Sequence, residues 1–225
     1  MKFSGFIFDF NGVLFWDQEI QERAWCQFAE EAFGTTLNHE MMVIHVHGRN
    51  NQHTLEFLAG SKLADFQIAH LSARKESIYR GLCSALGGEF KLSPGSKGVL
   101  DELATRGIPR TIATASGKEN LDFFYEKLRL ENWFDRHLIV FDDGLRPGKP
   151  APDIYLQAVR MIGLTPSRCV VVEDSLVGIQ AAHAAGIGYV IALGESDQHA
   201  WLRSLQGVNQ VVESLAHLDW EELVY

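Results

Sequence analysis

Short runs of apolar residues alternate along this chain with longer segments whose lengths suit helices. The strand-like runs are Phe6–Phe8, Thr111–Ala115, Leu138–Phe141, Cys169–Glu173, Tyr189–Leu193 and Gln210–Val212. Helices are expected between them, several with glycine just after the last residue, over Ser96–Arg106, Asn120–Leu130, Asp153–Ile162 and Leu176–Ala185. Strands that are apolar throughout and alternate with helices predict an α/β fold, in which a doubly wound parallel sheet is covered on both faces.

Residues 17–87 interrupt this alternation because they contain no convincing strand pattern. In a first helix the apolar positions recur every four residues, at Ile20, Ala24, Phe28 and Ala32, and Gly34 follows. A second helix carries Leu71, Lys75, Tyr79 and Leu82 on one side. We therefore predict a core domain of residues 1–16 and 88–225 with an inserted helical cap domain of residues 17–87. Closing helices are expected at Trp201–Leu205 and Leu215–Val224.

The composition adds limits on partners and location. The 225 residues include 20 Lys and Arg against 29 Asp and Glu, a net charge of −9, and 46% are hydrophobic. This acidic balance argues against a general nucleic-acid binder or a binder of anionic membranes, and the longest apolar runs are too short to cross a bilayer. Three scattered cysteines, and an N-terminus without the pattern of a secretion signal, predict free thiols in the cytoplasm. We expect a monomer or a weak dimer.

Polar side chains follow four of the predicted strands, whose carboxyl ends form the ligand-binding edge of a parallel sheet. The residues concerned are Asp9, Asn11, Thr114, Ser116, Lys149, Glu173 and Asp174. Clustered carboxylates suit Mg²⁺, whereas a hydroxyl group, an ammonium group and helix N-terminal amides suit a phosphate. A carboxylate beside both can act as a nucleophile towards phosphorus and form an aspartyl-phosphate.

The order and spacing of these residues resemble the four motifs of the haloacid dehalogenase-like (HAD) superfamily. The matching segments are Asp9-Phe10-Asn11-Gly12-Val13-Leu14, Thr114 with Ser116, Gly148-Lys149-Pro150, and Val171-Val172-Glu173-Asp174-Ser175. The helical insertion after the first motif is similar to the C1 cap of the branch that includes beta-phosphoglucomutase and phosphoglycolate-type phosphatases. The resemblance covers nearly the whole chain and implies a Rossmann-like core.

The resemblance also implies roles for individual residues. The implied catalytic residues are Asp9, Asn11, Thr114 and Lys149, with Asp9 as the nucleophile and Thr114 and Lys149 on the transferring phosphoryl group. The implied ligands of Mg²⁺ are Asp9, the backbone carbonyl of Asn11, Asp174 and, directly or from a second layer, Glu173. The implied substrate-binding residues are Ser116, His47, Arg49 and Lys75.

One position departs from the pattern of the family. The second residue after the nucleophile is usually an aspartate that protonates the leaving oxygen and then activates water, but here it is Asn11. An amide cannot shuttle a proton at neutral pH, and general acid–base help is worth about 10²–10⁴-fold. We therefore expect Asn11→Asp to raise activity. Trp16 replaces a further aspartate and makes the mouth of the site more apolar, and Asp17 follows where its direction can differ.

Four explanations of Asn11 stay open. A proton shuttle could come from His47 or Asp17, the substrate could be an acyl or aryl phosphate that needs no acid, catalysis could be lost with binding retained, or the residue could be an introduced substitution.

The function that we predict is Mg²⁺-dependent hydrolysis of a small phosphorylated metabolite through an aspartyl-phosphate on Asp9. The alternatives are a mutase of the beta-phosphoglucomutase type, an impaired phosphometabolite binder, and phosphonate cleavage through Lys62 or Lys75. Glu173 and Asp174 argue against dehalogenation.

Overall fold

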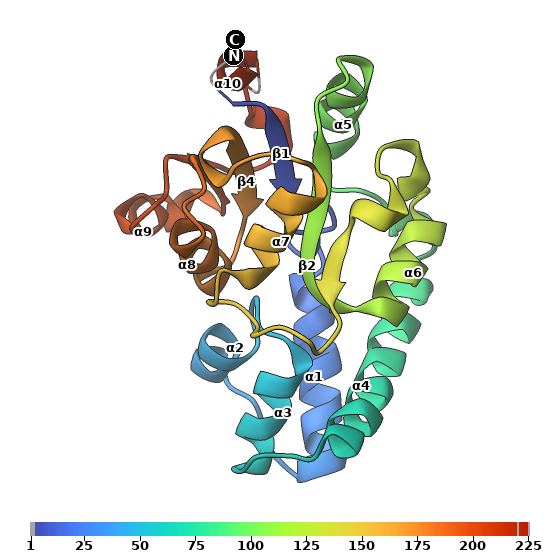
Figure 1. Cartoon of the computed structure of the whole chain (residues 1–225). Coiled ribbons are helices and arrows are strands. Elements are labelled where there is room, and N and C mark those ends of the chain that lie inside the picture. Colours follow the sequence, from blue (N-terminus) through green and yellow to red (C-terminus); the bar gives the residue numbers. More distant parts are fainter. Residues whose placement is uncertain (1–2, 220, 225) are drawn as a thin grey trace.

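A six-stranded parallel sheet forms the centre of the core in the computed structural model, which describes residues 3–219 and 221–224 (Figure 1). The strands are β1 (Gly5–Phe8), β2 (Arg110–Gly117), β3 (Val140–Asp142), β4 (Cys169–Glu173), β5 (Tyr189–Leu193) and β6 (Gln210–Val212). Their order across the sheet is β3-β2-β1-β4-β5-β6, and every neighbouring pair is parallel. The predicted doubly wound α/β fold is confirmed.

Apolar side chains cover both faces of this sheet because successive residues of a strand point to opposite sides. In β1, Phe6 and Phe8 join a cluster that includes residues of α5 (Ser96–Thr105) and α6 (Lys118–Lys127). Ile7 joins the cluster on the other face, with residues of α7 (Asp153–Met161), α8 (Leu176–Ala184) and α9 (His199–Ser204). The burial of β1 on both faces fixes the register with its neighbours, where Ile7 lies opposite both Thr111 and Val171.

Four helices follow β1 and lie below the carboxyl ends of the strands: α1 (Gln18–Phe33), α2 (His39–His45), α3 (Asn51–Ala59) and α4 (Asp65–Ala85) (Figure 1). They share an apolar cluster of their own around Phe28 and Leu55, whereas Tyr79 and Cys83 in the last turns of α4 pack into the cluster of the core. The division of the chain into core and cap domains remains a prediction. Although α4 has 21 residues, neither it nor any other helix in the described ranges is apolar enough to cross a membrane.

The predicted strands agree closely with the structure, and the differences have local causes. β2 continues to Gly117, so α6 begins at Lys118 rather than Asn120. α6 ends at Lys127 instead of Leu130, and Arg129 just beyond has a left-handed backbone with φ of 54°. In front of β3, Arg136–Leu138 form a 3₁₀ turn, which the side chain of Asp135 caps by accepting from the amide of His137.

The predicted closing helix over Leu215–Val224 is wrong. The structure has a 3₁₀ turn at Leu215–His217 and then α10 (Glu221–Val224), and Trp220 lies outside the described residues. The backbone at Leu218 is extended, with φ of −85° and ψ of 118°, which stops the turn from continuing as a helix. Both Leu215 and Leu218 are buried in the core in this conformation.

The substitution Gly95→Ala tests the contact between the start of α5 and the C-terminal segment. Gly95 has a φ of +83°, and a Cβ atom there would lie 2.0 Å from the backbone nitrogen of Ala216. We expect a loss of about 2–4 kcal/mol from backbone strain and overpacking, measured by urea unfolding. The control is Gly98→Ala, at an exposed position of the same helix with open space around it, which should gain about 0.5–1 kcal/mol. Equal stability of the two variants would contradict the prediction.

Candidate functional site

A cleft of about 1080 Å³ extends along the carboxyl ends of the strands and between these ends and the cap helices. From the core it is lined by Asp9, Asn11, Thr114, Ser116, Lys149 and Asp174, and from the cap by His47, Arg49 and Lys75. The residues singled out in the four sequence motifs and in the cap therefore border one cleft. Glu173 is fully buried directly behind it.

Lys149 holds the centre of the site. Its Nζ donates to Asp9 Oδ1 at 2.7 Å and also to Glu173 Oε1, and the residue is 4% exposed. Burial alone would lower the pKa of Lys149, but the two carboxylates raise it above the ordinary lysine value, so this side chain stays an ammonium group. Burial raises the pKa of Asp9 to about 7 although Lys149 opposes the change, and Glu173 adds to the rise.

The carboxylate of Glu173 is saturated with hydrogen bonds. Oε1 accepts from Lys149 and from the hydroxyl of Tyr155 at 2.6 Å, whereas Oε2 accepts from the backbone amides of Asp174 and Ser175 and from the Ser175 hydroxyl, each at 3.0 Å. The resemblance implies that Glu173 binds Mg²⁺ either directly or from a second layer. These contacts favour the second layer, where Glu173 orients Lys149. Gly178 permits this arrangement because a Cβ atom there would lie 1.8 Å from Oε1.

Oxygen atoms suited to a divalent cation converge beside Lys149. Asp9, Glu173 and Asp174 each offer a carboxylate oxygen, and the three atoms lie within 4.8 Å of one another. Burial, together with the negative charges of Glu173 and Asp9, raises the pKa of Asp174 well above its ordinary value. A buried, purely oxygen-donor group with this mutual repulsion fits Mg²⁺, which would relieve it. Gly12 is required here, since its φ is +78° and a Cβ atom would lie 1.9 Å from Asp174 Oδ2.

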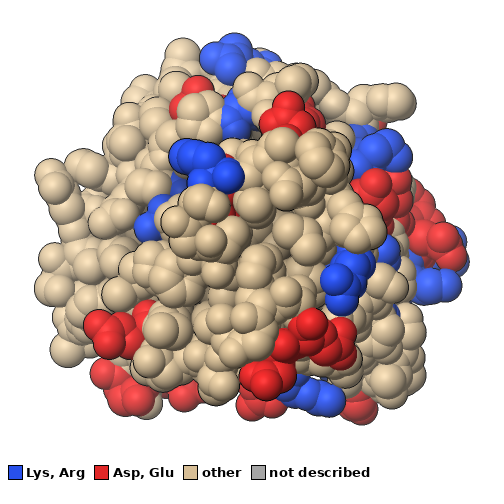
Figure 2. Space-filling model, turned by 90° about the horizontal axis from the view of Figure 1, so that it is seen from below, with Lys and Arg blue, Asp and Glu red and all other residues tan. Residues whose placement is uncertain are grey.

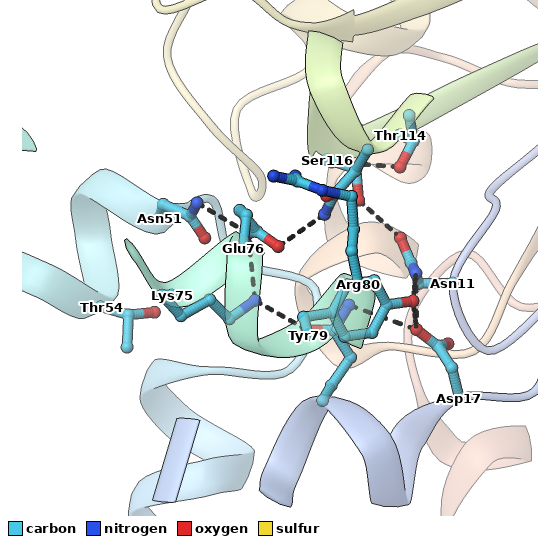
Figure 3. Close-up of polar contacts among 12 residues, drawn as sticks. Asn11, Asp17, Asn51, Thr54, Lys75, Glu76, Tyr79, Arg80, Thr114 and Ser116 are labelled. Carbon is cyan, nitrogen blue, oxygen red and sulfur yellow. Dashed lines mark hydrogen bonds and ion pairs between the residues drawn. The ribbon is translucent and has the colours of Figure 1, made fainter. Parts of the chain in front are cut away.

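The end of β2 supplies the two hydroxyl groups that were predicted for phosphate. Thr114 is buried, and its Oγ1 accepts from the backbone amide of Ser116 at 3.1 Å. Ser116 in turn donates from its hydroxyl to Oδ1 of Asn11 at 2.8 Å (Figure 3). The end of β2 is thereby fixed against the loop after β1, and both border the same cleft.

The side chain of Asp17 points towards Asn11. The sequence alone did not determine this direction. Its Oδ2 accepts from Asn11 Nδ2 at 2.7 Å and from the hydroxyl of Tyr79, while Oδ1 accepts from the backbone amide of Gly12 at 3.1 Å. The side chain is 2% exposed, and burial raises its pKa. Trp16, by contrast, lines the cleft with 49% of its surface exposed, as expected for an apolar mouth.

Lys75, which the resemblance implies to face the substrate, is held by contacts within the cap. It borders the cleft but is 2% exposed, and its Nζ donates to Gln21 Oε1 at 2.8 Å and to Glu76 Oε1 at 3.0 Å (Figure 3). The ammonium group also lies 4.7 Å from the centre of the Trp25 ring. Contacts within the cap therefore occupy most of its hydrogen-bonding capacity.

Glu76 was not among the predicted site residues, and the structure places it at the junction of three helices. Besides Lys75, it accepts from Asn51 of α3 at 2.8 Å and from Asn120 of α6 at 2.6 Å. Burial raises the pKa of Glu76, but Lys75 and the two amides outweigh it and hold the pKa below the ordinary value. The only local signal was the neighbouring Lys75, because these partners come from distant parts of the chain.

The remaining cap residues reach the site from the loop between α2 and α3. Arg49 Nη1 donates to the backbone carbonyl of Lys149 at 3.2 Å, and its Nε donates to the carbonyl of Ile44 at 3.3 Å. His47 Nε2 lies 2.9 Å from Glu22 Oε1, which raises the pKa of His47, but the larger effect of burial lowers it below its ordinary value. Arg49 thus joins the cap to the loop that carries Lys149.

Known proteins resemble this chain over most of its length. Hexitol phosphatase A of Escherichia coli (strain K12) is 29% identical over 86% of this chain and 84% of that protein. Beta-phosphoglucomutase of Bacillus subtilis (strain 168) is 29% identical over 96% of this chain and 95% of that protein. A HAD hydrolase of family IA, variant 3, from Entamoeba histolytica HM-1:IMSS has a TM-score of 0.86 and 32% identity, and the match covers 98% of this chain and 97% of that one.

The family comparison spans most of the sequence. Residues 3–186, which contain all four motifs and the helical insertion, match the haloacid dehalogenase-like hydrolases. The chain therefore belongs to the haloacid dehalogenase-like hydrolase family.

Proposed function

We propose that this protein is a Mg²⁺-dependent phosphatase that hydrolyses a small phosphorylated metabolite, with Asp9 as the nucleophile. The observation that carries the proposal is the buried contact of Lys149 with Asp9 and Glu173 beside Asp174, at the strand ends that face the cleft. An ammonium group at 2.7 Å favours the ionised, nucleophilic form of Asp9 and can also contact a phosphoryl oxygen. The relationship to a hexitol phosphatase supports the same reaction.

In the proposed reaction, a carboxylate oxygen of Asp9 attacks phosphorus and the bond from phosphorus to the leaving oxygen breaks. The products are an aspartyl-phosphate and an alkoxide, which takes a proton from water. A water molecule then attacks the phosphorus of the aspartyl-phosphate and loses a proton to solvent. The bond between phosphorus and the Asp9 oxygen breaks, which releases inorganic phosphate and restores the carboxylate of Asp9. Lys149 and the hydroxyl of Thr114 stabilise the charge on the equatorial phosphoryl oxygens.

Asp9, Asp174 and the backbone carbonyl of Asn11 would hold Mg²⁺ in this proposal. When bound, the cation supplies positive charge that offsets the repulsion between these carboxylates and the phosphate. Glu173 acts behind them, because its oxygens already accept hydrogen bonds from Lys149, Tyr155 and the loop after β4.

The lining of the cleft supports a hydroxylated leaving group. Beyond Asp9 the cap and the first turn of α1 contribute hydrogen-bonding side chains, which are those of Gln21, His47, Arg49 and Asn51. Such groups suit the hydroxyls of a sugar or polyol phosphate. Two relatives, hexitol phosphatase A and beta-phosphoglucomutase, are named for substrates of this kind.

The second candidate is an impaired phosphometabolite binder, which Asn11 favours. A mutase is less favoured than hydrolysis, since returning a phosphoryl group to a second hydroxyl needs a proton-transferring group, and the amide of Asn11 cannot serve as one. Hydrolysis needs only water as acceptor and tolerates slow proton transfer. Phosphate release therefore separates a phosphatase from a binder.

The distribution of charge supports a small ligand rather than a large polyanion. On the cap face in Figure 2, Lys and Arg side chains are interspersed with Asp and Glu around an uncharged central area. Lys149 and Lys75 are buried along the cleft, where only a ligand small enough to enter can approach them. The three free cysteines support the prediction of a reducing, cytoplasmic location.

Asp9→Asn tests the covalent mechanism. The substitution keeps the size of the side chain and removes the nucleophilic carboxylate, so phosphate release from an aryl phosphate with Mg²⁺ should fall by about 10⁴-fold or more. The matched control is Asp65→Asn, at the exposed first turn of α4, which should keep wild-type activity. Activity of Asp9→Asn at the wild-type rate would rule out an aspartyl-phosphate on this residue.

Removal and addition of Mg²⁺ test the proposed cation site. At about 100 times the dissociation constant, a ligand of the folded state stabilises it by about 2.7 kcal/mol. The unfolding temperature of wild type should then rise by about 5–10 °C, whereas that of Asp174→Asn should hardly change. Differential scanning fluorimetry after treatment with chelator measures both, with Asp65→Asn as control. An equal rise in Asp174→Asn would exclude Asp174 as a ligand.

The stability of the cation-free protein should also depend on Asp174 and on pH. Burial and the nearby carboxylates raise the pKa of Asp174 above its ordinary value of 3.8, so the folded protein binds this proton more tightly than the unfolded chain does. The resulting stabilisation is complete below about pH 3.8 and is lost as the pH rises. In chelator, Asp174→Asn should therefore exceed wild type in unfolding temperature near pH 7, by a margin that shrinks towards pH 4. A margin independent of pH would contradict this.

A further inference from the structure

The amide of Asn11 has hydrogen-bond partners within the protein at both its nitrogen and its oxygen. Its Nδ2 donates to Asp17 Oδ2 at 2.7 Å and to the Tyr79 hydroxyl at 3.3 Å, and its Oδ1 accepts from the Ser116 hydroxyl at 2.8 Å (Figure 3). These partners come from the start of α1, from α4 and from the end of β2. The side chain of Asn11 is therefore fixed by three separate segments.

Asp17 is surrounded by donors. Besides Asn11 and Tyr79, Gln21 Nε2 donates to it at 3.2 Å and the backbone amide of Gly12 at 3.1 Å. The carboxylate is 2% exposed and accepts from four donors, three of them at Oδ2, and these contacts hold it in place behind Asn11. Both residues border the cleft, and Asn11 lies nearer the nucleophile in the chain, two residues after Asp9, so we expect Asp17 to influence the reaction through Asn11.

The polarity of this contact restricts the chemistry of position 11. Because the carboxylate of Asp17 only accepts, it needs a donor opposite, and an asparagine supplies one whereas an ionised aspartate does not. A second carboxylate would place two acceptors about 2.7 Å apart in a buried site, a spacing at which like charges repel strongly.

We propose that Asp17 is a positioning residue that requires an amide at position 11, so that a carboxyl group can be restored there only by exchanging the two side chains. In the double variant Asn11→Asp with Asp17→Asn, the donor and the acceptor change places and the contact is kept. The position facing the cleft then carries a carboxyl group that can transfer a proton. The catalytic part of this inference rests on the proposed phosphatase function.

The experiment compares wild type, Asn11→Asp, Asp17→Asn and the double variant. Unfolding temperature is measured in chelator, and kcat and KM are measured for an aryl phosphate with Mg²⁺. Because of the contact with Asp17, we expect Asn11→Asp alone to lower the unfolding temperature and to gain little in kcat, in contrast to the rise in activity expected from the pattern of the family. The added Asp17→Asn should return the unfolding temperature to near wild type and raise kcat at least about 10-fold over Asn11→Asp, with KM nearly unchanged.

The control is Asn11→Asp with Asp65→Asn, which has the same net charge as the double variant but leaves Asp17 in place. It should recover neither stability nor kcat. Equal stability and equal kcat of Asn11→Asp and the double variant would overturn the inference. If Asn11→Asp cannot be obtained folded, recovery of the fold in the double variant supports the inference, and failure of both overturns it.

The two proposals fail in different ways. If no variant releases phosphate, the proposed function is at fault, and the stability cycle still decides whether Asp17 requires an amide opposite. If wild type releases phosphate but the stability effects of the two substitutions simply add, the coupling between Asp17 and position 11 is absent.

Discussion

The buried ammonium group of Lys149 is the constraint on which the site depends. A lysine with 4% exposure persists as a cation only because Asp9 and Glu173 both face it. Removal of one partner from such a buried pair typically costs about 3–5 kcal/mol, because the other charge is left uncompensated. Glu173 is held in turn by Tyr155 of α7 and by the loop after β4. The position of Asp9 is thus linked, through Lys149 and Glu173, to α7, which packs on one face of the sheet.

The cap repeats this arrangement with a second buried pair. Lys75 and Glu76 lie side by side on α4, and Glu76 reaches both α3 and α6 through the amides of Asn51 and Asn120. Since α6 begins directly after β2, whose end carries Ser116, hydrogen bonds to α6 tie the cap to this end of the strand. One pair therefore organises the surroundings of the nucleophile, and the other joins the cap to the core.

The strands and the residues at their ends could be predicted from the sequence, because both depend on residues that are neighbours in the chain. Apolar runs located the strands, and the ends of these runs located Asp9, Thr114 and Asp174, because parallel strands bring their carboxyl ends to one edge. The direction of Asp17 and the pairing of Lys75 could not be predicted in this way. Both are decided by contacts with side chains 54 to 62 positions away, Gln21 with Lys75 and Asp17 with Tyr79. Periodicity indicates which residues share a helix face, but it does not identify the charged or polar side chains that contact this face.

The course of α4 has a consequence for the modularity of the insertion. Its first turns belong to the apolar cluster of the cap, but Tyr79 and Cys83 fill space in the cluster beneath the sheet. Excision of residues 17–87 would remove these side chains, together with Ile20 and Ala24 of α1, and open a cavity in the remaining core. A cap from a relative could be grafted onto this core only with junctions that retain both the first turns of α1 and the last turns of α4. The inserted helices and the α/β core, which are separate segments of the sequence, thus share one hydrophobic core.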